Sequence, residues 1–258
     1  MTKPASPAPR ILIVVPCYNE EASIAGVVAD INRVKRAHGL NADVLVVNDC
    51  SRDGTLAVVR TLDCQYLDLP VNLGIGGAMH AGYRYAHNHG YDMAVQMDGD
   101  GQHPAVELPK LLQPILAGDA DVVIGSRFLE RAGFQSTGLR RIGIRYFRWL
   151  NQGLIGQTVH DSTSGFRAFN RRTLAVVNRY YPDEYPEPEA IVQFGLSNLR
   201  IREVPVQMRE RQGGVSSINS SRALYYMLKV TLGILFVYVR LARIHGRYAG
   251  PDRKPATA

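Results

Sequence analysis

The feature that most constrains the fold is an alternation of short apolar segments with longer segments of helical periodicity. Each apolar segment is rich in β-branched residues and ends at a proline, a polar turn or a glycine. The expected strands are 11–15, 44–47, 66–69, 93–97 and 121–124, and the expected helices between them are 21–37, 53–62, 78–89 and 104–117. Such alternation predicts an α/β fold in which helices cover both faces of a mostly parallel sheet.

Beyond Gly125 this regular alternation ends. The expected elements are a basic, aromatic helix at 139–150, a strand at 165–169, a Pro-rich elbow at 181–188, a helix at 190–196, a strand at 201–208 and a long apolar helix at 221–247. We expect one catalytic domain at 10–217, a membrane-interface or partner-binding helix at 218–248, and disordered ends at 1–9 and 249–258.

Composition narrows the class of protein. The chain has 258 residues, of which 46% are hydrophobic, so it is long enough to bury a core. Three cysteines, Cys17, Cys50 and Cys64, cannot all pair and have no CxxC spacing, which favours a reduced, cytoplasmic setting. The first ten residues contain no apolar run, so we expect no secretory signal.

The charge is unevenly distributed. Residues 1–138 carry a net charge of −4, whereas residues 139–258 carry +11. The second half is therefore suited to an anionic partner, which can be a nucleic acid, a phosphorylated substrate or a membrane surface.

Polar turns follow the predicted strands, at the edge where parallel sheets bind ligands. After the first strand, Tyr18 can pack on a base or ribose, and Asn19 and Glu20 can bond a nucleobase or cap a helix. After the second, Asp49 can accept from a ribose or base. The glycine loop 72–78 lets backbone N–H groups approach an anion. Each segment can equally be an ordinary capped or tight turn.

The turn after the fourth strand carries the sequence DGDGQH at 98–103. Asp98 and Asp100 can both reach one hard divalent cation, and Gln102 adds a neutral oxygen ligand. An Asp-Gly turn is common in itself, but two carboxylates directly after an apolar strand repel each other unless a cation lies between them. The sequence therefore favours a site for a hard divalent cation.

Taken together, these segments resemble the inverting family-two glycosyltransferases of the GT-A fold. The resemblance covers roughly residues 10–217. It rests on VPCYNE, on VVNDCSRDGT with Asn48 where Asp is usual, on NLGIGGA, DGDGQH and GSR, and on DSTSGFRAF. GSR followed by a basic helix and DSTSGFR looks most like the branch that transfers sugars to polyprenyl phosphate.

The resemblance implies a nucleotide diphosphate sugar of the GDP, UDP or dTDP type as donor, Mg²⁺ or Mn²⁺ as cofactor, and inversion at the anomeric carbon. The implied donor-binding residues are Pro16, Tyr18, Asn19, Glu20, Asp49, Gly76, Asp98, Gly99, Arg209, Arg211 and Ser216. The implied metal ligands are Asp98, Asp100 and Gln102. The implied catalytic set is Asp100, Arg127, Asp161 and Glu189. Arg127 is expected to stabilise phosphate charge, and the loop 209–216 to close over the diphosphate.

The sequence leaves two classes of acceptor substrate open. A polyprenyl phosphate or a lipid-linked cell-envelope glycan fits the basic helix, whose Arg140, Arg141, Arg145 and Arg148 are available to bind phosphate or simply form a solvated surface. A saccharide hydroxyl needs a base, and Asp161, Glu187 and Glu189 are the candidates. The segment 185–189, YPEPE, departs from the polyprenyl-phosphate pattern.

Two other classes fit less well. A nucleotidyltransferase would carry a glycine- and lysine-rich loop after the first strand, and a basic nucleic-acid-binding module would carry a compact motif; neither is present, so we expect no nucleic acid partner. Five basic residues of the last helix fall within about 60° on a helical wheel, and the remainder is apolar. We expect the helix to lie on the inner face of the cytoplasmic membrane, with the basic stripe toward the headgroups, or to bind a small membrane protein or a second subunit.

Overall fold

The computed structural model describes residues 8–129, 138–209 and 220–248. The strands in this part of the chain are β1 (Ile11–Cys17), β2 (Ala42–Asn48), β3 (Gln65–Asp68), β4 (Met93–Gln96), β5 (Val122–Ser126), β6 (Arg167–Asn170) and β7 (Ile201–Pro205). The α-helices are α1 (Ile24–Ala37), α2 (Thr55–Val59), α3 (Gly74–Asn88), α4 (Leu108–Leu116), α5 (Gly138–Ile155), α6 (Arg171–Arg179), α7 (Pro186–Leu196) and α8 (Ser220–Tyr248). A 3₁₀ turn at Ala105–Glu107 precedes α4.

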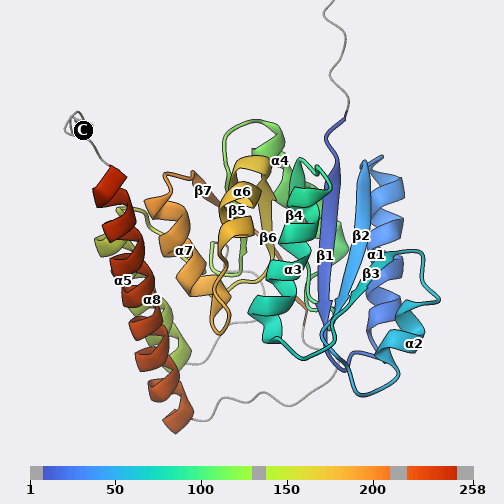
Figure 1. Ribbon diagram of the computed structural model, residues 1–258, viewed down its shortest axis with the longest axis horizontal. Helices are drawn as coiled ribbons and strands as arrows, with labels where there is room; N and C mark the ends of the chain where they lie inside the picture. Colours follow the sequence, from blue (N-terminus) through green and yellow to red (C-terminus); the bar gives the residue numbers. More distant parts are fainter. Residues whose placement is uncertain (1–7, 130–137, 210–219, 249–258) are drawn as a thin grey trace, which may run out of the picture.

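The strands form a single sheet in the order β3-β2-β1-β4-β6-β5-β7 (Figure 1). Every neighbouring pair is parallel except those of β6, which runs antiparallel to both β4 and β5. Ala168 of β6 is paired with Val95 on one side and with Val123 on the other. The predicted mostly parallel sheet with flanking helices is confirmed. The reversed β6 brings its own beginning to the edge at which β4 and β5 end.

Helices cover both faces of the sheet, and the two cores alternate along β1. Ile11, Ile13 and Val15 pack with α1, α2 and α4, whereas Leu12 and Val14 pack with α3, α6 and α7. Because successive side chains of a strand point to opposite faces, a strand that is buried on both sides must be apolar throughout. This explains why the first predicted strand is an unbroken apolar run.

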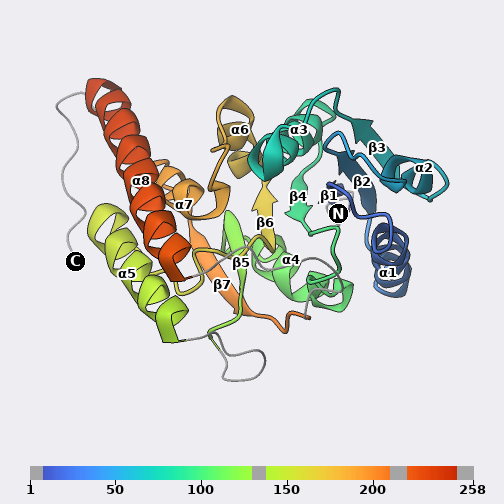
Figure 2. The ribbon, with the colours of Figure 1, turned by 90° about the horizontal axis from the view of Figure 1, so that it is seen from below.

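Helices α5 and α8 lie side by side at one end of the molecule, next to α7 (Figure 2). A third core holds them there, made of Phe147 of α5, Val192 of α7, and Val230, Ile234 and Val237 of α8. No helix within residues 8–129, 138–209 and 220–248 combines the length and apolar character that crossing a bilayer requires.

Several element ends are shifted from the expectation, and the three differences that bear on the site concern α3, α6 and α7. Helix α3 begins at Gly74 rather than at 78, so most of the predicted glycine loop is its first turn. Helix α6 was not expected; its start is capped by the Asn170 side chain, which accepts from the Thr173 N–H. Helix α7 begins at Pro186, inside the predicted elbow, because proline is compatible with the first turn of a helix, where its missing N–H has no role. The predicted ends 1–9 and 249–258 fall wholly or largely outside the described residues.

Candidate active site

The candidate site lies at the edge where β1, β2, β4 and β5 end (Figure 1). The turns after these four strands carry most of the residues that the motifs singled out. Because β6 is antiparallel, the segment 161–166 that leads into it reaches the same edge, between the ends of β4 and β5. Topology therefore assembles turns that are far apart in the sequence.

The turns after β1 and β2 are fastened to each other. The backbone N–H of Asn19 donates to Ser51 Oγ at 3.0 Å, and the Asn19 amide oxygen accepts from the Arg52 N–H at 2.8 Å. The N–H of Glu20 donates to Thr55 Oγ1 at 2.8 Å. These bonds give Asn19 a structural role, with φ of +57°. Tyr18, whose side chain is 41% exposed, keeps its ring open to a ligand.

Asp49 holds the start of α3. Its two carboxylate oxygens accept from the N–H groups of Leu73 at 2.7 Å and Gly74 at 2.8 Å, in the manner of a helix cap. The preceding Asn48 donates its amide to Asp68 at 2.8 Å. An Asp at position 48, as is usual in the motif, would set two carboxylates against each other, so the departure has a local reason.

Gly76, the glycine expected beside the nucleotide, is buried within the first turn of α3. A Cβ at this position would lie 2.2 Å from the backbone oxygen of Asp183 and 2.4 Å from that of Pro182. Glycine is therefore required here by the close approach of the chain that leads to α7. A nucleotide contact at Gly76 stays a prediction.

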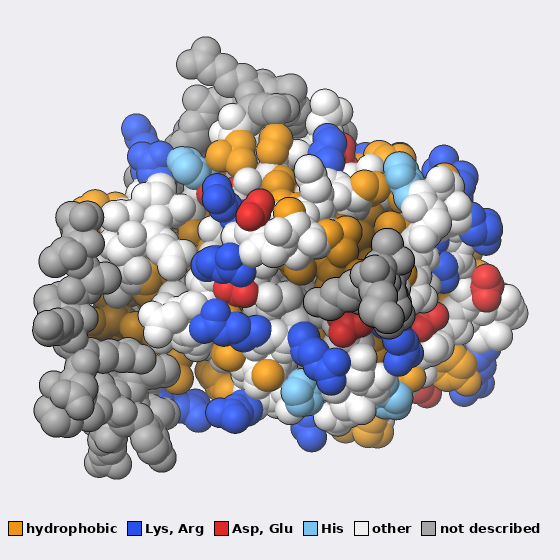
Figure 3. Space-filling model, turned by 90° about the horizontal axis from the view of Figure 1, so that it is seen from above, with side chains coloured by type: hydrophobic (Ala, Val, Ile, Leu, Met, Phe, Trp, Pro, Cys, Tyr) orange, Lys and Arg blue, Asp and Glu red, His pale blue; other side chains and the backbone are white. Residues whose placement is uncertain are grey.

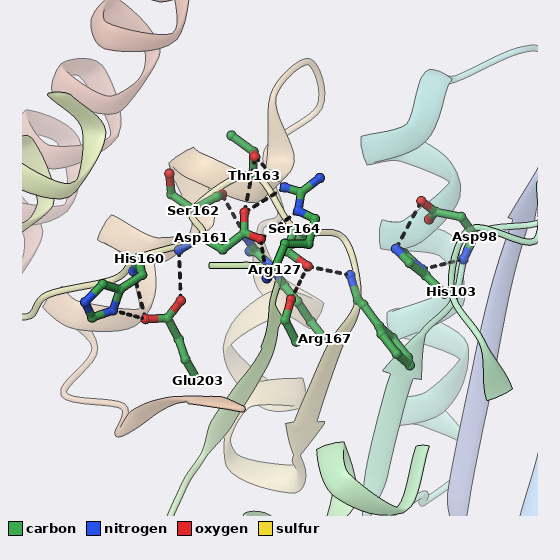
Figure 4. Close-up of polar contacts among 12 residues, drawn as sticks. Asp98, His103, Arg127, His160, Asp161, Ser162, Thr163, Ser164, Arg167 and Glu203 are labelled. Atoms are coloured by element: carbon green, nitrogen blue, oxygen red, sulfur yellow. Dashed lines mark hydrogen bonds and ion pairs between the residues drawn. The ribbon is translucent and has the colours of Figure 1, made fainter. Parts of the chain in front are cut away.

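The turn after β4 presents Asp98 with loose side-chain contacts (Figure 4). The Asp98 carboxylate lies 3.5 Å from Gln96 Nε2 and 3.6 Å from His103 Nε2, and the side chain is 30% exposed. His103 Nδ1 accepts the Asp98 backbone N–H at 3.0 Å, and its ring stacks on Phe166 at 4.8 Å. The Nδ1 acceptor leaves the ring proton on Nε2, facing the carboxylate. His103 thus fixes both the backbone and the direction of Asp98.

Asp100 is mostly buried in the same turn, and its Oδ1 accepts the Gln102 N–H at 3.0 Å. Gly99 lets the turn lie against the end of β1, because a Cβ there would come 3.0 Å from the Pro16 carbonyl oxygen. The Gln102 carbonyl accepts the N–H of Arg209 at 3.0 Å. The Arg209 guanidinium lies 3.5 Å from Asp30 of α1, so this side chain is directed toward α1. Arg211 and Ser216 lie outside the described residues.

The donor set suits a cation that arrives with a phosphate ligand. In the described residues, no group of three or more His, Cys, Asp or Glu side chains forms a complete metal cage. Asp98 and Asp100 supply carboxylate oxygens, and Gln102 follows in the same turn. Mg²⁺ is commonly bound by one or two carboxylates together with substrate phosphates and water. The residues present therefore fit a divalent ion held jointly with a diphosphate.

Arg127, directly after β5, is locked to Asp161 (Figure 4). Its Nε and Nη2 donate to the two carboxylate oxygens at 2.7 Å each, its backbone N–H donates at 3.0 Å, and Nη2 also reaches Thr163 Oγ1 at 2.8 Å. Asp161 is fully buried, whereas the Arg127 side chain is 22% exposed. Burial alone would lower the pKa of Arg127, but Asp161 and the charge of Asp98 raise it. Arg127 therefore stays charged and faces the site.

Glu203 of β7 holds the backbone on which the Arg127–Asp161 pair depends. One of its carboxylate oxygens accepts the N–H of Asp161 and the other accepts the N–H of His160, each at 2.8 Å. The second oxygen also lies 2.8 Å from His160 Nδ1. Glu203 thus holds the backbone of the Asp161 turn, which in turn orients Arg127.

Arg167 and Glu187 form a second charged group beside β4. Arg167 is fully buried and donates to the carbonyls of Ser164 at 2.7 Å and Ser162 at 3.0 Å, while its Nη1 has no hydrogen bond in the described part of the chain. Desolvation raises the pKa of Glu187 and the charge of Asp98 adds to this, while Arg167 and a hydrogen bond with Gln96 oppose it. Glu187 is thus close enough to Asp98 for their charges to interact.

Glu189 points elsewhere, into the packing between α7 and α8. It is mostly buried, and a Cβ at Gly233 of α8 would lie 2.5 Å from its Oε1. Desolvation, with the charges of Glu184 and Asp183 adding to it, raises the pKa of Glu189 to about 7. Of the three carboxylates named as candidate bases, Glu187 lies within range of the Asp98 turn, Asp161 is committed to Arg127, and Glu189 faces α8.

The basic helix is only partly described at the level of side chains. Arg145 and Arg148 are exposed on α5, whereas the side chains of Arg140 and Arg141 are outside what the structure describes. Sequence reasoning missed His103, Glu203 and the role of Arg167. His103 sits inside the DGDGQH motif and had a signal there; Glu203 had none, because its contacts cross from β7 to a distant turn.

Comparison with known proteins agrees with this geometry. The profile of a family described as glycosyl transferase family 2 matches residues 12–177. Polyprenol monophosphomannose synthase of Mycolicibacterium smegmatis is 31% identical over 238 residues, covering 87% of this chain and 86% of the relative. Undecaprenyl-phosphate mannosyltransferase of Micrococcus luteus is 32% identical over 222 residues, covering 81% and 88%.

Solved structures support the fold. Mannosyl-3-phosphoglycerate synthase of Rubrobacter xylanophilus has a TM-score of 0.66 at 18% identity, covering 97% of this chain and 79% of that one. Glucosyl-3-phosphoglycerate synthase of Mycobacterium tuberculosis, in complex with Mn²⁺, UDP and glucosyl-3-phosphoglycerate, has a TM-score of 0.65 at 21% identity, covering 89% and 80%. The chain belongs to glycosyltransferase family 2 and is a glycosyltransferase with the GT-A fold.

Proposed function

We propose that this glycosyltransferase moves a sugar from a nucleotide diphosphate sugar to a polyprenyl phosphate. The observation that carries the proposal is the Arg127–Asp161 pair. It presents a permanently charged, oriented guanidinium beside Asp98, while the nearby carboxylate of Asp161 is fully used to hold it. A site built in this way attracts an anionic acceptor and offers it no free base from Asp161.

The relatives support this acceptor class. The Mycolicibacterium and Micrococcus proteins are named for polyprenol monophosphomannose and undecaprenyl-phosphate, and both are matched over most of their length. A relative from Methanococcus voltae, 29% identical over 220 residues, is named for UDP-N-acetylglucosamine and dolichyl phosphate. The printed names include more than one sugar, so the sugar and the base of the donor, of the GDP, UDP or dTDP type, are left to experiment.

Donor binding is assigned to the turns after β1, β2 and β4. The open ring of Tyr18 would pack on the base or ribose, with Glu20 at the same turn. Asp98, Asp100 and Gln102 would hold Mg²⁺ or Mn²⁺ together with the diphosphate. The cation would neutralise the charge that develops on the leaving diphosphate. The complex of the Mycobacterium tuberculosis structure with Mn²⁺ and UDP is consistent with this assignment.

The reaction is a single displacement. An oxygen of the acceptor phosphate attacks the anomeric carbon, the bond from that carbon to the diphosphate oxygen breaks, and the nucleoside diphosphate leaves with inversion. The acceptor oxygen is already ionised near neutral pH, so no proton needs to be removed from it. Arg127 would bind the acceptor phosphate and hold it in line, and positioning and charge stabilisation would supply most of the rate.

A saccharide hydroxyl is the second candidate acceptor. Unlike a phosphate, it must lose a proton during attack, and this needs a base. Glu187 is the carboxylate that supports this alternative, because it lies near Asp98 and Gln96 with a raised pKa. Under this alternative Glu187 is indispensable, whereas under the phosphate proposal it is not.

The acceptor also implies a place of action. A polyprenyl chain resides in a lipid bilayer, so we propose that the enzyme works on the inner face of the cytoplasmic membrane as a peripheral protein. The basic second half of the chain supports this, since anionic headgroups attract positive charge.

A donor panel tests the proposal. GDP-, UDP- and dTDP-sugars are each incubated with a polyprenyl phosphate and Mn²⁺, and the products are identified by mass spectrometry. We expect one donor to give a polyprenyl phosphate sugar, and Glu187→Gln to retain most of this activity. Transfer only to saccharides, with loss of activity in Glu187→Gln, would favour the hydroxyl acceptor instead.

A further inference from the structure

The outward side of α8 is apolar although its inward side already packs on α7. Val230, Ile234 and Val237 are buried in the core with α7. A second apolar row is exposed, with Phe236 at 73% and Leu228 at 59%. Its members are spaced along one side of the helix: Leu228, Leu232, Leu235, Phe236 and Val239. Monomeric proteins rarely expose a row of this kind without a partner.

Helix α5 extends the same surface. Tyr146 of α5 and Thr231 of α8 share a hydrogen bond of 3.1 Å, which fixes how the two helices face each other. At about 100° per residue, Leu235 and Leu228 lie about 40° and 60° from Thr231, whereas Leu232 and Phe236 lie about 100° and 140° from it, and Trp149 lies about 60° from Tyr146. The apolar row of α8 therefore begins on the side next to α5 and extends away from it, and the two helices lie side by side (Figure 2). Trp149 is 72% exposed. We call this surface the α5–α8 face.

The charge of the α5–α8 face indicates which kind of partner it binds. Residues 138–155 contain four Lys or Arg and residues 220–248 contain five, and neither segment contains an Asp or Glu. Arg145 and Arg148 are exposed beside Trp149. Elsewhere on the molecule, where Lys and Arg are also spread over the surface (Figure 3), some exposed arginines lie beside a carboxylate, as Arg171 lies beside Asp92.

These observations disfavour a symmetric contact between two copies. Two α5–α8 faces would bring the exposed Arg145 and Arg148 of both copies to one interface, with no Asp or Glu in either helix to pair with them, and like charges across an interface are costly. In an anionic lipid bilayer, the leucines and the phenylalanine can insert among the acyl chains while the arginines bind the negatively charged headgroups. Tryptophan is also the side chain most typical of the boundary between headgroups and acyl chains.

We propose that the α5–α8 face docks the enzyme on an anionic lipid bilayer, with Trp149 and Phe236 entering the headgroup boundary. The proposal deepens the acceptor assignment made above and rests on it for its biological purpose. It also differs from the arrangement expected from the helical wheel. Lys229 pairs with Glu184 at 2.6 Å and Arg240 lies over the ring of Tyr180, so these two residues of the basic stripe contact the domain itself.

The docked orientation suits transfer to a lipid. Helix α8 begins at the end of the molecule where β1, β2, β4 and β5 end (Figure 1). A bilayer that lies along α5 and α8 therefore passes beside the edge of the sheet that carries Arg127 and Asp98. The proposal requires the phosphate of a membrane-resident acceptor to reach this edge while its chain stays in the lipid.

The chain offers a direct reporter, because Trp149 is its single tryptophan. The full chain is mixed with vesicles of phosphatidylcholine alone, or of phosphatidylcholine and phosphatidylglycerol in equal parts. We expect co-flotation and a shift of Trp149 emission to shorter wavelength with the mixed vesicles only. The double variant L232Q/F236Q should bind these vesicles at least about tenfold more weakly, because two large apolar side chains no longer enter the lipid.

The matched control is Leu116→Gln, which changes an equally exposed leucine (53%) on α4 and should leave binding unchanged. Circular dichroism shows whether each variant is folded. Unchanged emission and no flotation of the wild type would overturn the proposal. Concentration-dependent dimerisation that buries Trp149 would also overturn it and would identify the face as a contact between copies.

The acceptor assignment is tested separately with a short polyprenyl phosphate dispersed in water. If docking is the only function of the face, L232Q/F236Q keeps its transfer to this acceptor and loses transfer to a long-chain acceptor in mixed vesicles. If neither protein transfers sugar to any polyprenyl phosphate while the wild type still floats, the acceptor assignment fails and the docking surface stands.

Discussion

Two acidic turns at the same edge of the sheet are used in opposite ways. The side chain of Asp98 is 30% exposed, and its carboxylate lies 3.5 Å from the Gln96 amide and 3.6 Å from the His103 ring. Asp161 is fully buried and accepts from Arg127 through both of its oxygens at 2.7 Å. The Asp98 carboxylate is oriented but can still bind a ligand, whereas both oxygens of Asp161 are used to orient Arg127.

A carboxylate that follows a strand can bind a ligand or hold a neighbouring side chain in place, and the groups that face it decide between these two roles. Asp98 faces a histidine ring that accepts the N–H of its own turn, and its carboxylate has no bidentate partner of the kind that Asp161 has. Asp161 faces a guanidinium, and a bidentate pair of this kind is among the strongest contacts that a carboxylate makes. We therefore expect Asp161 to act as a positioning residue; three of the four predictions below test this contrast, and the fourth concerns Glu189.

The largest effect is expected for Asp100→Ala. The proposed cation loses one of its ligands, so it neutralises the charge on the departing diphosphate less well. Transfer should therefore fall by about a thousandfold or more. Release of free nucleoside diphosphate measures the effect. Asp63→Ala, which removes an exposed carboxylate away from the site, should behave as wild type. Full activity of Asp100→Ala, or in excess EDTA, would contradict the metal assignment.

Next come Arg127→Ala and Asp161→Asn. Arg127→Ala should lose about a hundredfold or more of its activity, because the acceptor phosphate loses its cation. Asp161→Asn should lose less, chiefly through a higher KM for the acceptor, since Arg127 is present but poorly held. The double variant should be no worse than Arg127→Ala, because Asp161 acts through Arg127.

If Asp161 acts as a general base instead, the kinetics of the variants should differ in two ways. In that case the losses of the two single variants multiply in the double variant, and Asp161→Asn loses the acidic limb of its pH–rate profile. Kinetics of the four proteins over a range of pH and acceptor concentration separate the two roles.

A smaller effect is expected for His103→Gln. The ring that accepts the Asp98 N–H and faces its carboxylate is lost, so the affinity for Mn²⁺ should fall by about tenfold, as is usual when a residue that orients a metal ligand is removed. Titration of Mn²⁺ followed by electron paramagnetic resonance measures this without turnover. His160→Gln, whose ring contacts Glu203 instead, is the control and should bind Mn²⁺ as wild type does. Equal affinities of all three proteins would remove His103 from this role.

The smallest effect on activity is expected for Glu189→Gln, which acts on stability. Because the pKa of Glu189 is raised to about 7 in the folded protein, folding favours its protonated form. Its contribution to stability is therefore greatest at low pH, declines as the pH rises above the ordinary pKa of glutamate, and is lost near pH 7 and above. Glu189→Gln imitates the neutral acid, so its Tm should exceed that of wild type by a few degrees at pH 8.

The same comparison at pH 5 is the control, since wild-type Glu189 is then mostly protonated and the two Tm values should converge. Turnover should change little at either pH. A strong loss of transfer in Glu189→Gln, with a normal Tm, would return Glu189 to the list of candidate bases.

The sequence pattern was enough to predict the sheet, the helices on both of its faces and the edge at which we place the candidate site. Apolar runs such as that at 11–15 can only be buried on both faces, and alternation with helices makes such strands parallel. The metal site expected at the DGDGQH turn also rests on neighbouring residues, because two carboxylates this close repel each other unless a cation lies between them; it stays a prediction. These properties depend on residues that are close in the sequence, so their pattern is enough to predict them.

The partner of each carboxylate could not be predicted from the sequence and became visible only in the folded chain. Asp161 meets Arg127 because β6 is antiparallel, Glu203 holds both from an edge strand, and Glu189 lies under Gly233 of α8 rather than in the site. Lys229 and Arg240 turn toward Glu184 and Tyr180, which leaves an apolar row facing outward. Each of these outcomes depends on a contact between segments far apart in the chain, and a side chain's partner at such a distance is set by packing rather than by local periodicity.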